Sequence, residues 1–152
     1  LSHHGDFKPE NVVFDTKGKA YLIDFSLAGF QSKDNHLLPG TIFYMSYEAA
    51  FAEVMDQRND VYQIGVMIYR YFSEGKHPII DNFSDIVTVL NDLNTKSYTP
   101  LAIKQLIKIS GMDISDEDGL AINRVLEKSV ARMQNRYKTP RVFIEDLKKI
   151  IK

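Results

Sequence analysis

The sequence contains no cysteine, no long apolar run and almost no excess of charge of one sign. Without cysteine, a disulfide framework and thiolate metal sites are excluded. No apolar stretch approaches the roughly 20 residues that a membrane helix needs, and no signal-peptide pattern opens the chain. The 19 basic and 20 acidic residues give a net charge of −1, which argues against nucleic-acid binding by bulk charge. We therefore expect a cytoplasmic protein with no membrane segment and no nucleic-acid partner.

The length and composition predict one globular domain of mixed secondary structure. The chain has 152 residues, of which 44% are hydrophobic, as is ordinary for a folded domain. Short runs of β-forming residues on either side of a turn with Gly18 predict a hairpin over 12–23. Residues 26–47 show no periodicity and predict a long loop. Helical patterns follow, so the expected fold is mainly α (α+β), with a small β-hairpin and a helical body.

The strongest helical pattern is central to the chain. One face is predicted to carry Val61, Ile64, Ile68 and Phe72, and other faces are apolar too, so this helix is expected to be buried. Further helices are expected after N-cap candidates. Ser84 would start a helix that ends at about Leu93, and Thr99, before Pro100, would start one that ends at about Ile109. Ser115 would start an amphipathic helix, and Thr139, before Pro140, would start the last helix.

The densest polar cluster lies in residues 4–11. Asp6 and Asn11 are five positions apart with a proline between them, so they belong to a loop and not to one helix face. A carboxylate and an amide oxygen suit a hard cation and a proton-accepting role, and Lys8 between them suits phosphate. Such residues are also routine in surface loops, so the cluster alone does not define a site.

A second carboxylate makes the cluster more informative. Asp24 directly follows the apolar run 21–23, where a strand is expected to end. The hairpin would bring Asp24 back beside Asn11 at the start of the first strand, and the pair would form a divalent-metal site. The alternative is that Asp24 merely caps a turn.

Five motifs in order resemble the eukaryotic-type (Hanks-type) Ser/Thr protein kinase family. HGDFKPENVVFD and LIDFSLA resemble the catalytic loop and the magnesium-binding loop of that family. The other three similar segments are Gly40-Thr41 with YMSYEA at 44–49, NDVYQIGV at 59–66, and Asn135-Arg136-Tyr137. The resemblance covers nearly the whole chain and implies a protein-kinase-like large C-terminal lobe.

The resemblance implies chemical roles for four residues. Asp6 would accept or orient the proton of the substrate hydroxyl, and Lys8 would touch the γ-phosphate of ATP. Asn11 and Asp24 would bind the Mg²⁺ ions that bridge the phosphates. ATP and Mg²⁺ are thus the implied cofactors, and a protein with a Ser or Thr acceptor is the implied substrate.

Other matched residues have positional roles in the family. Thr41 would help to hold the acceptor residue, and Glu48 would pair with Arg136 to anchor the activation segment. Asp60 would hold the backbone of the catalytic loop from below. The resemblance therefore implies structural roles for Glu48, Asp60 and Arg136.

Two departures from the family pattern concern function. Gly5 replaces the usual arginine, so we expect no activation by loop phosphorylation, although Ser32 is a candidate phosphosite. Ser26 replaces the glycine of D-F-G but leaves Asp24 in place.

The resemblance begins only at the catalytic loop. The chain starts with Leu1 and has no glycine-rich loop, V-A-I-K lysine or partner glutamate. We therefore expect residues 1–152 to be part of a kinase domain: catalytic loop 4–11, activation segment 24–48 and helical subdomain 59–152. An absent N-terminal lobe would pack on it, and the isolated chain would be inactive.

Two other functions stay open at this stage. His-Gly-Asp with Asn11 five positions after the aspartate also resembles the site of aminoglycoside and choline kinases, which phosphorylate small molecules. The lobe could instead be a catalytically inactive pseudokinase or scaffold that binds a partner. Retention of Asp6, Lys8, Asn11 and Asp24 favours the enzyme.

Overall fold

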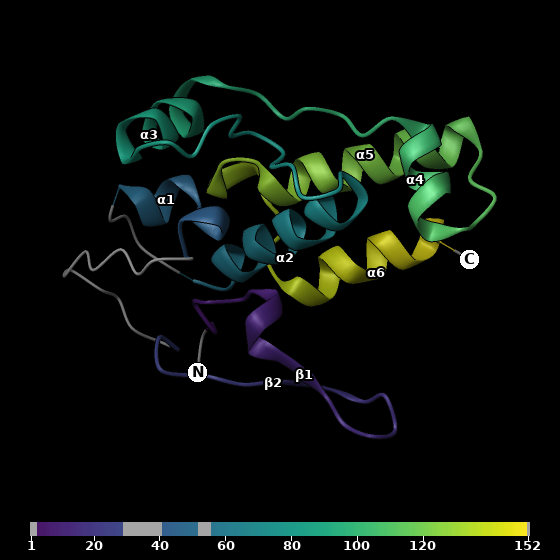
Figure 1. Ribbon diagram of the computed structural model, residues 1–152, viewed down its shortest axis with the longest axis horizontal. Helices are drawn as coiled ribbons and strands as arrows, with labels where there is room; N and C mark the ends of the chain where they lie inside the picture. Colours follow the sequence, from purple (N-terminus) through teal and green to yellow (C-terminus); the bar gives the residue numbers. More distant parts are fainter. Residues whose placement is uncertain (1–2, 29–40, 52–55, 152) are drawn as a thin grey trace.

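The computed structural model describes residues 3–28, 41–51 and 56–151, residue 41 by its backbone alone. A two-stranded hairpin projects from a body of six α-helices in this part of the chain, as expected (Figure 1). The elements, in order, are η1 (Pro9–Asn11), β1 (Val12–Phe14), β2 (Ala20–Leu22), η2 (Thr41–Tyr44), α1 (Tyr47–Ala50), α2 (Gln57–Phe72), α3 (Ile86–Thr95), α4 (Ile103–Ser110), α5 (Asp116–Val130), η3 (Met133–Asn135) and α6 (Pro140–Ile150). No helix among these described residues is both long and apolar enough to cross a membrane.

The hairpin forms where the β-forming runs predict it. The strands β1 and β2 pair antiparallel, with Val12 opposite Leu22 and Phe14 opposite Ala20. Gly18 has a φ of +77° in the turn, a conformation that glycine adopts without strain. The Asp15 carboxylate accepts hydrogen bonds from the backbone N–H groups of Lys17 and Lys19 and so fixes the turn. This register determines where the chain leaves β2, which is where Asp24 lies.

Helix α2 is the centre of the lobe, and it contacts α4, α5 and α6. Its Val61, Tyr69 and Phe72 pack into a core with α4, α5 and α6, whereas Tyr62 and Val66 pack into a second core with η2 and α3. The buried helix was predicted, but its buried face was predicted only in part. Ile64 and Ile68 are only half-buried, whereas the polar residues Asn59, Asp60 and Gln63 are buried.

Helix α2 and helix α5 approach each other closely at Gly65. A Cβ atom at this position would overlap the hydroxyl group of Ser129 on α5, whose own Oγ donates to the carbonyl oxygen of Leu126. The absence of a side chain at Gly65 therefore allows the two helices to pack at this distance.

The helix starts agree with the capping signals at two positions and differ at two. Ser115 and Thr139 accept hydrogen bonds from Asp118 N and Val142 N, as predicted for N-caps. The helix expected from Ser84 is instead capped by Asp85, whose carboxylate accepts from Thr88 N at 2.8 Å.

The helix expected from Thr99 begins only at Ile103, so that prediction was wrong. The cause is a tertiary contact of Leu101 with α5. Asn123 accepts a hydrogen bond from Leu101 N at 2.7 Å and donates one to Leu101 O at 3.0 Å. The Leu101 side chain is buried in the same region, so these residues dock as an extended segment before the helix starts.

Candidate active site

The polar loop segment at residues 4–7 is held by side chains from the start of α2. The Asp60 carboxylate accepts hydrogen bonds from His4 N at 2.8 Å and from Gly5 N at 2.9 Å. These residues are 56 and 55 positions apart in the sequence. A tight buried loop must find acceptors for its N–H groups, and Asp60 supplies both oxygens. The predicted contact between Asp60 and this loop is confirmed.

Gln63 is a second support for the loop, and the sequence analysis missed it. Its amide donates to Gly5 O at 3.0 Å and accepts from Phe7 N at 2.7 Å. Gln63 lies three residues after Asp60, so both side chains leave α2 on neighbouring positions of one face. The sequence signals that could have indicated this role are the spacing from Asp60 and the position of an uncharged polar residue within the apolar middle of the helix, residues 61–69.

Asp6, Lys8 and Asn11 form a connected polar group on this loop. The Asp6 carboxylate is buried, and its Oδ2 lies 2.5 Å from Lys8 Nζ. The Asn11 amide nitrogen donates to the same Oδ2 at 3.1 Å and to Asp6 O at 2.9 Å. Because Asn11 Nδ2 is used in this way, its orientation is fixed and Oδ1 is the atom left to bind a ligand. The structure thus brings together three of the predicted site residues.

The second loop is attached to the first by hydrogen bonds on both sides of the hairpin. Ile23 N donates to Asn11 O at 2.9 Å, and His4 Nε2 lies 3.0 Å from Ile23 O. The His4 ring also packs edge-on against Phe25, with 4.8 Å between ring centroids. Because Asp24 lies between Ile23 and Phe25, it is held next to the end of the loop that carries Asn11.

Asp24 is exposed and has a left-handed backbone with a φ of +59°. Its Oδ1 accepts from Ser26 Oγ at 2.6 Å and from Ser26 N at 3.2 Å. These two bonds, the hydroxyl bond first, hold the pKa of the Asp24 carboxyl below its usual value. The carboxylate therefore stays ionised at neutral pH, and both Ser26 hydrogen bonds are made to Oδ1.

We expect Ser26→Gly to raise the pKa of Asp24 toward its ordinary value. The substitution removes the hydroxyl donor and retains the backbone N–H donor. An NMR titration of the Asp24 carboxyl in the two proteins measures the effect. An unchanged titration midpoint would show that the Ser26 hydroxyl does not act on Asp24 in solution.

Gly5 is required by the backbone of the loop. Its φ is +86°, and a Cβ atom there would lie 3.0 Å from Leu27 O. We expect Gly5→Ala to lower the free energy of unfolding by about 1–3 kcal/mol, as for other strained left-handed residues. Gly18→Ala is the matched control, because Gly18 also has a positive φ (+77°) but nothing lies within 4 Å of its Cβ position. Denaturant unfolding should show the larger loss at Gly5, and equal losses would contradict the predicted contact with Leu27.

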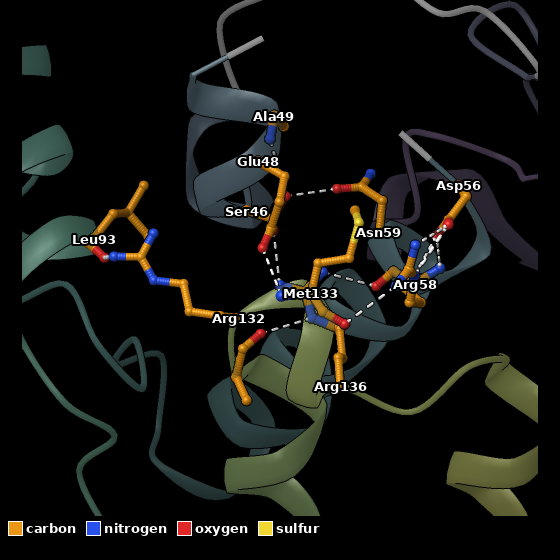
Figure 2. Close-up of polar contacts among 11 residues, drawn as sticks. Ser46, Glu48, Ala49, Asp56, Arg58, Asn59, Leu93, Arg132, Met133 and Arg136 are labelled. Atoms are coloured by element: carbon orange, nitrogen blue, oxygen red, sulfur yellow. Dashed lines mark hydrogen bonds and ion pairs between the residues drawn. The ribbon is translucent and has the colours of Figure 1, made fainter. Parts of the chain in front are cut away.

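Glu48 at the start of α1 is joined to the segment after α5 (Figure 2). Glu48 Oε2 accepts from Arg136 Nη2 at 2.8 Å, and Oε1 accepts from Met133 N at 2.7 Å. Glu48 and Arg136 are 2% and 3% exposed, so this is a buried ion pair between residues 88 positions apart. The predicted ion pair is confirmed.

The other two nitrogen atoms of the Arg136 guanidinium also donate hydrogen bonds. Its Nε donates to Ala131 O at 2.8 Å, and Nη1 donates to Arg58 O at 3.0 Å. Burial alone would raise the pKa of Glu48, but the Arg136 charge and the donated hydrogen bonds outweigh it and hold this pKa below its usual value. One charged pair therefore ties α1, the start of α2 and the segment before α6 together.

Some predicted residues lie outside the described part of the chain. Thr41 begins η2, but its side chain is not described, and its expected contact with an acceptor residue stays a prediction. Gly40 and the candidate phosphosite Ser32 also lie outside the described residues.

Asn11 and Asp24, at the ends of the two joined loops, carry oxygen atoms of a kind that could bind a magnesium ion. Asn11 offers an amide oxygen and Asp24 a carboxylate oxygen, which are hard ligands of the kind that Mg²⁺ prefers. Phosphate oxygens and water complete such a site in nucleotide-binding enzymes. No cluster of three or more His, Cys, Asp or Glu side chains that could hold a metal occurs within residues 3–28, 41–51 and 56–151, so a dedicated all-protein metal cage is not found there.

A helical lobe whose central helix holds a polar loop beside a two-stranded hairpin is typical of the large lobe of protein kinases. The family model described as the protein kinase domain matches residues 2–141. The chain therefore belongs to the protein kinase family.

Individual relatives agree with this assignment. The chain is 29% identical over 155 residues to a probable serine/threonine-protein kinase of Clostridium perfringens, a match that covers 98% of this chain and 21% of that protein. It is 30% identical over 141 residues to a receptor-like protein kinase of Ipomoea nil, covering 84% of this chain and 13% of that protein. The chain thus spans about a fifth or less of the length of these relatives.

A solved structure shows the same fold. The kinase PK-1 of Cydia pomonella granulovirus matches with a TM-score of 0.63 and 22% sequence identity. The match covers 96% of this chain and 48% of the viral protein. The predicted kinase-like helical lobe is confirmed.

Proposed function

We propose that this chain supplies the catalytic and magnesium-binding loops of a serine/threonine protein kinase. In the full-length gene product it would transfer the γ-phosphate of ATP to Ser or Thr hydroxyls of proteins. We assign the catalytic loop to residues 4–11, the activation segment to 24–48 and the helical subdomain to 59–152 of a partial kinase domain. The observation that carries the proposal is the attachment of both polar loops to each other through Ile23, which holds Asp24 beside the loop that carries Asp6, Lys8 and Asn11.

In this proposal the buried Asp6 carboxylate accepts the proton of the attacking hydroxyl. The substrate oxygen forms a bond to the γ-phosphorus, the bond to the β-phosphate oxygen breaks, and ADP leaves. Lys8, which is next to Asp6, stabilises the charge on the transferred group. Asn11 and Asp24 would hold Mg²⁺, which neutralises phosphate charge when bound. Thr41 would position the acceptor residue, whereas Glu48, Asp60 and Arg136 keep the loops in place.

Exposed apolar side chains near the hairpin support a further part of the proposal. Val13 is 41% exposed, Ile23 is 42% exposed and Phe25 is 52% exposed. Apolar groups gathered beside a polar site favour coverage by another surface. We propose that an N-terminal lobe in the full-length gene product packs here and encloses ATP against the hairpin.

The test compares the full-length gene product with residues 1–152 alone. With ATP and Mg²⁺, the full-length protein is expected to phosphorylate Ser or Thr peptides, whereas the 152-residue chain is expected to be inactive. Phosphoryl transfer depends on positioning and on stabilisation of charge, and this chain supplies only part of the nucleotide site. Robust Mg²⁺-dependent transfer by residues 1–152 would contradict the proposal that this chain supplies only part of the nucleotide site.

The same assay separates the two alternatives. Transfer to an aminoglycoside or to choline, with none to peptides, would favour a small-molecule phosphotransferase. No transfer to either substrate class by the full-length protein, with no binding of ATP, would favour a pseudokinase or scaffold. The match to the protein kinase domain over residues 2–141 supports the protein substrate.

A further inference from the structure

Ser26 carries a side chain in the second loop to which the proposed function gives no role. It stands where the D-F-G motif has glycine, so its hydroxyl group adds an oxygen atom that the motif itself does not supply. Ser26 and Asp24 are both exposed to solvent. An ion that enters from solvent can therefore reach both side chains.

The Ser26 hydroxyl and the Asp24 carboxylate are in direct contact. Ser26 Oγ donates its proton to Asp24 Oδ1 at 2.6 Å, and Ser26 N donates to the same oxygen at 3.2 Å. The backbone turns tightly at this point, with Ala28 N donating to Phe25 O at 3.0 Å. The two side chains therefore present their oxygen atoms side by side.

Each of these two side chains keeps oxygen lone pairs for a ligand. A hydroxyl oxygen has two lone pairs besides its proton, and no group in the described part of the chain donates to Ser26 Oγ. Both bonds to the Asp24 carboxylate end on Oδ1, so Oδ2 accepts none from these same residues. Lys8, whose charge acts on Asp24, forms its ion pair with Asp6 instead. The negative charge of Asp24 is therefore available to a metal cation.

We propose that Ser26 Oγ is an oxygen ligand of the divalent cation, beside Asp24 and Asn11. The cation would take Asp24 Oδ2 and one lone pair of Ser26 Oγ, while the hydroxyl continues to donate its proton to Oδ1. No proton is released, and the hydrogen bond between the two side chains is kept. Neutral serine and threonine hydroxyls are accepted ligands of Mg²⁺ in phosphate-binding loops. The inference rests on the proposed function, because it extends the magnesium site assigned there.

A second serine–aspartate pair in the chain lacks this free capacity and provides the control. Ser84 Oγ donates to Asp85 Oδ2 at 2.9 Å, and both residues are exposed. Thr88 N donates to Asp85 Oδ1, and Thr88 Oγ1 donates to Oδ2, each at 2.8 Å. Both oxygens of the Asp85 carboxylate are thus occupied at the start of α3, so this pair should not bind a cation.

The first test measures Mn²⁺ binding to the full-length gene product without nucleotide. Mn²⁺ takes the oxygen ligands that suit Mg²⁺, and electron paramagnetic resonance measures its free concentration. We expect Ser26→Ala to raise the dissociation constant of Mn²⁺ at least threefold. Ser26→Thr keeps a hydroxyl group and should bind like the wild-type protein, as should Ser84→Ala. Because Ser26 is exposed, unchanged melting temperatures should show that these variants fold.

Ser26→Cys distinguishes a metal ligand from a residue that only orients Asp24. A thiolate prefers soft cations to hard ones, and residues 1–152 contain no cysteine of their own. We expect Ser26→Cys to weaken Mn²⁺ binding and to tighten Cd²⁺ binding at least tenfold relative to the wild-type protein. Ser84→Cys measures what a single exposed thiol beside a carboxylate contributes, and its gain in Cd²⁺ affinity should be smaller.

Two results would overturn the role of Ser26 alone, provided that Asp24→Asn lowers Mn²⁺ affinity. One is unchanged Mn²⁺ binding by Ser26→Ala, and the other is a gain in Cd²⁺ affinity by Ser26→Cys no larger than that of Ser84→Cys. Failure of the magnesium site looks different. No Mn²⁺ binding by the wild-type protein, or undiminished binding by Asp24→Asn, would overturn the assigned metal site and the role of Ser26 with it.

Discussion

Replacement of Asp6 by Asn in the full-length gene product is expected to lower turnover by roughly 10²–10⁴-fold, the range for loss of general base catalysis. Asparagine keeps the shape of the side chain and its place beside Asn11, but it cannot take the substrate proton. Because the proposed metal ligands are untouched, the affinity for ATP should be retained. Peptide kinase assays and equilibrium ATP binding with Mg²⁺ measure the two quantities separately.

Asp24→Asn should differ from Asp6→Asn in its effect on nucleotide binding. Loss of the negative charge weakens the hold on Mg²⁺, so ATP affinity and turnover should both fall, and more peptide substrate should not restore activity. Lys8→Ala should resemble Asp6→Asn, as a defect confined to the transition state. Near-normal turnover of Asp6→Asn on Ser or Thr peptides would refute the catalytic role of the loop and favour the scaffold function.

Glu48→Ala is expected to lower the free energy of unfolding by on the order of 3–5 kcal/mol. Removing one partner of a buried ion pair leaves the other charge buried without compensation. Here the substitution would leave Arg136 unpaired and would also remove the acceptor of Met133 N. Urea or thermal unfolding measures the loss.

An exposed ion pair provides the control. Glu74 and Lys108 also form a close pair, at 2.6 Å, but both side chains are more than half exposed. Glu74→Ala should therefore cause a much smaller loss, as is usual for surface pairs. Similar losses at the two positions would contradict the proposed anchoring role of Glu48.

The Glu48 contribution also has a defined pH dependence. Its pKa is lowered in the folded state relative to the ordinary value of 4.5. The stabilisation is therefore fully present above that ordinary value and is lost as the pH falls through the folded-state pKa. Glu48→Gln should remove this acid-dependent part of the stability, which a comparison of unfolding at neutral and acidic pH would show.

Local signals in the sequence predict much of this structure. The hairpin follows from β-forming runs around a turn with Gly18, and two helix starts follow from Ser115 and Thr139. The proximity of Asp24 to Asn11 follows from hairpin geometry alone. The ion pair of Glu48 with Arg136 was expected only from the resemblance to the kinase family, because no local pattern links residues so far apart.

The features that were missed depend on contacts between distant segments. Asn123 on α5 fixes the backbone of Leu101 and delays the start of α4, although Thr99 before Pro100 is a good local start signal. Gln63 supports residues 5–7 from α2, but a glutamine within a helix gives little indication of its partner. Propensity and periodicity describe single elements, whereas these roles arise from packing between elements.

The support of residues 4–7 by α2 has a consequence for hydrogen exchange. The amide protons of His4, Gly5 and Phe7 are bound to side-chain oxygens of Asp60 and Gln63, and not to a helix or strand of their own. Their protection therefore lasts only while the loop is docked on α2. We expect these three amides to exchange together and to lose protection together in Asp60→Asn, while amides within α2 remain slow. The exchange of three protons thus reports whether the loop that carries Asp6 is assembled, even in a protein without substrate.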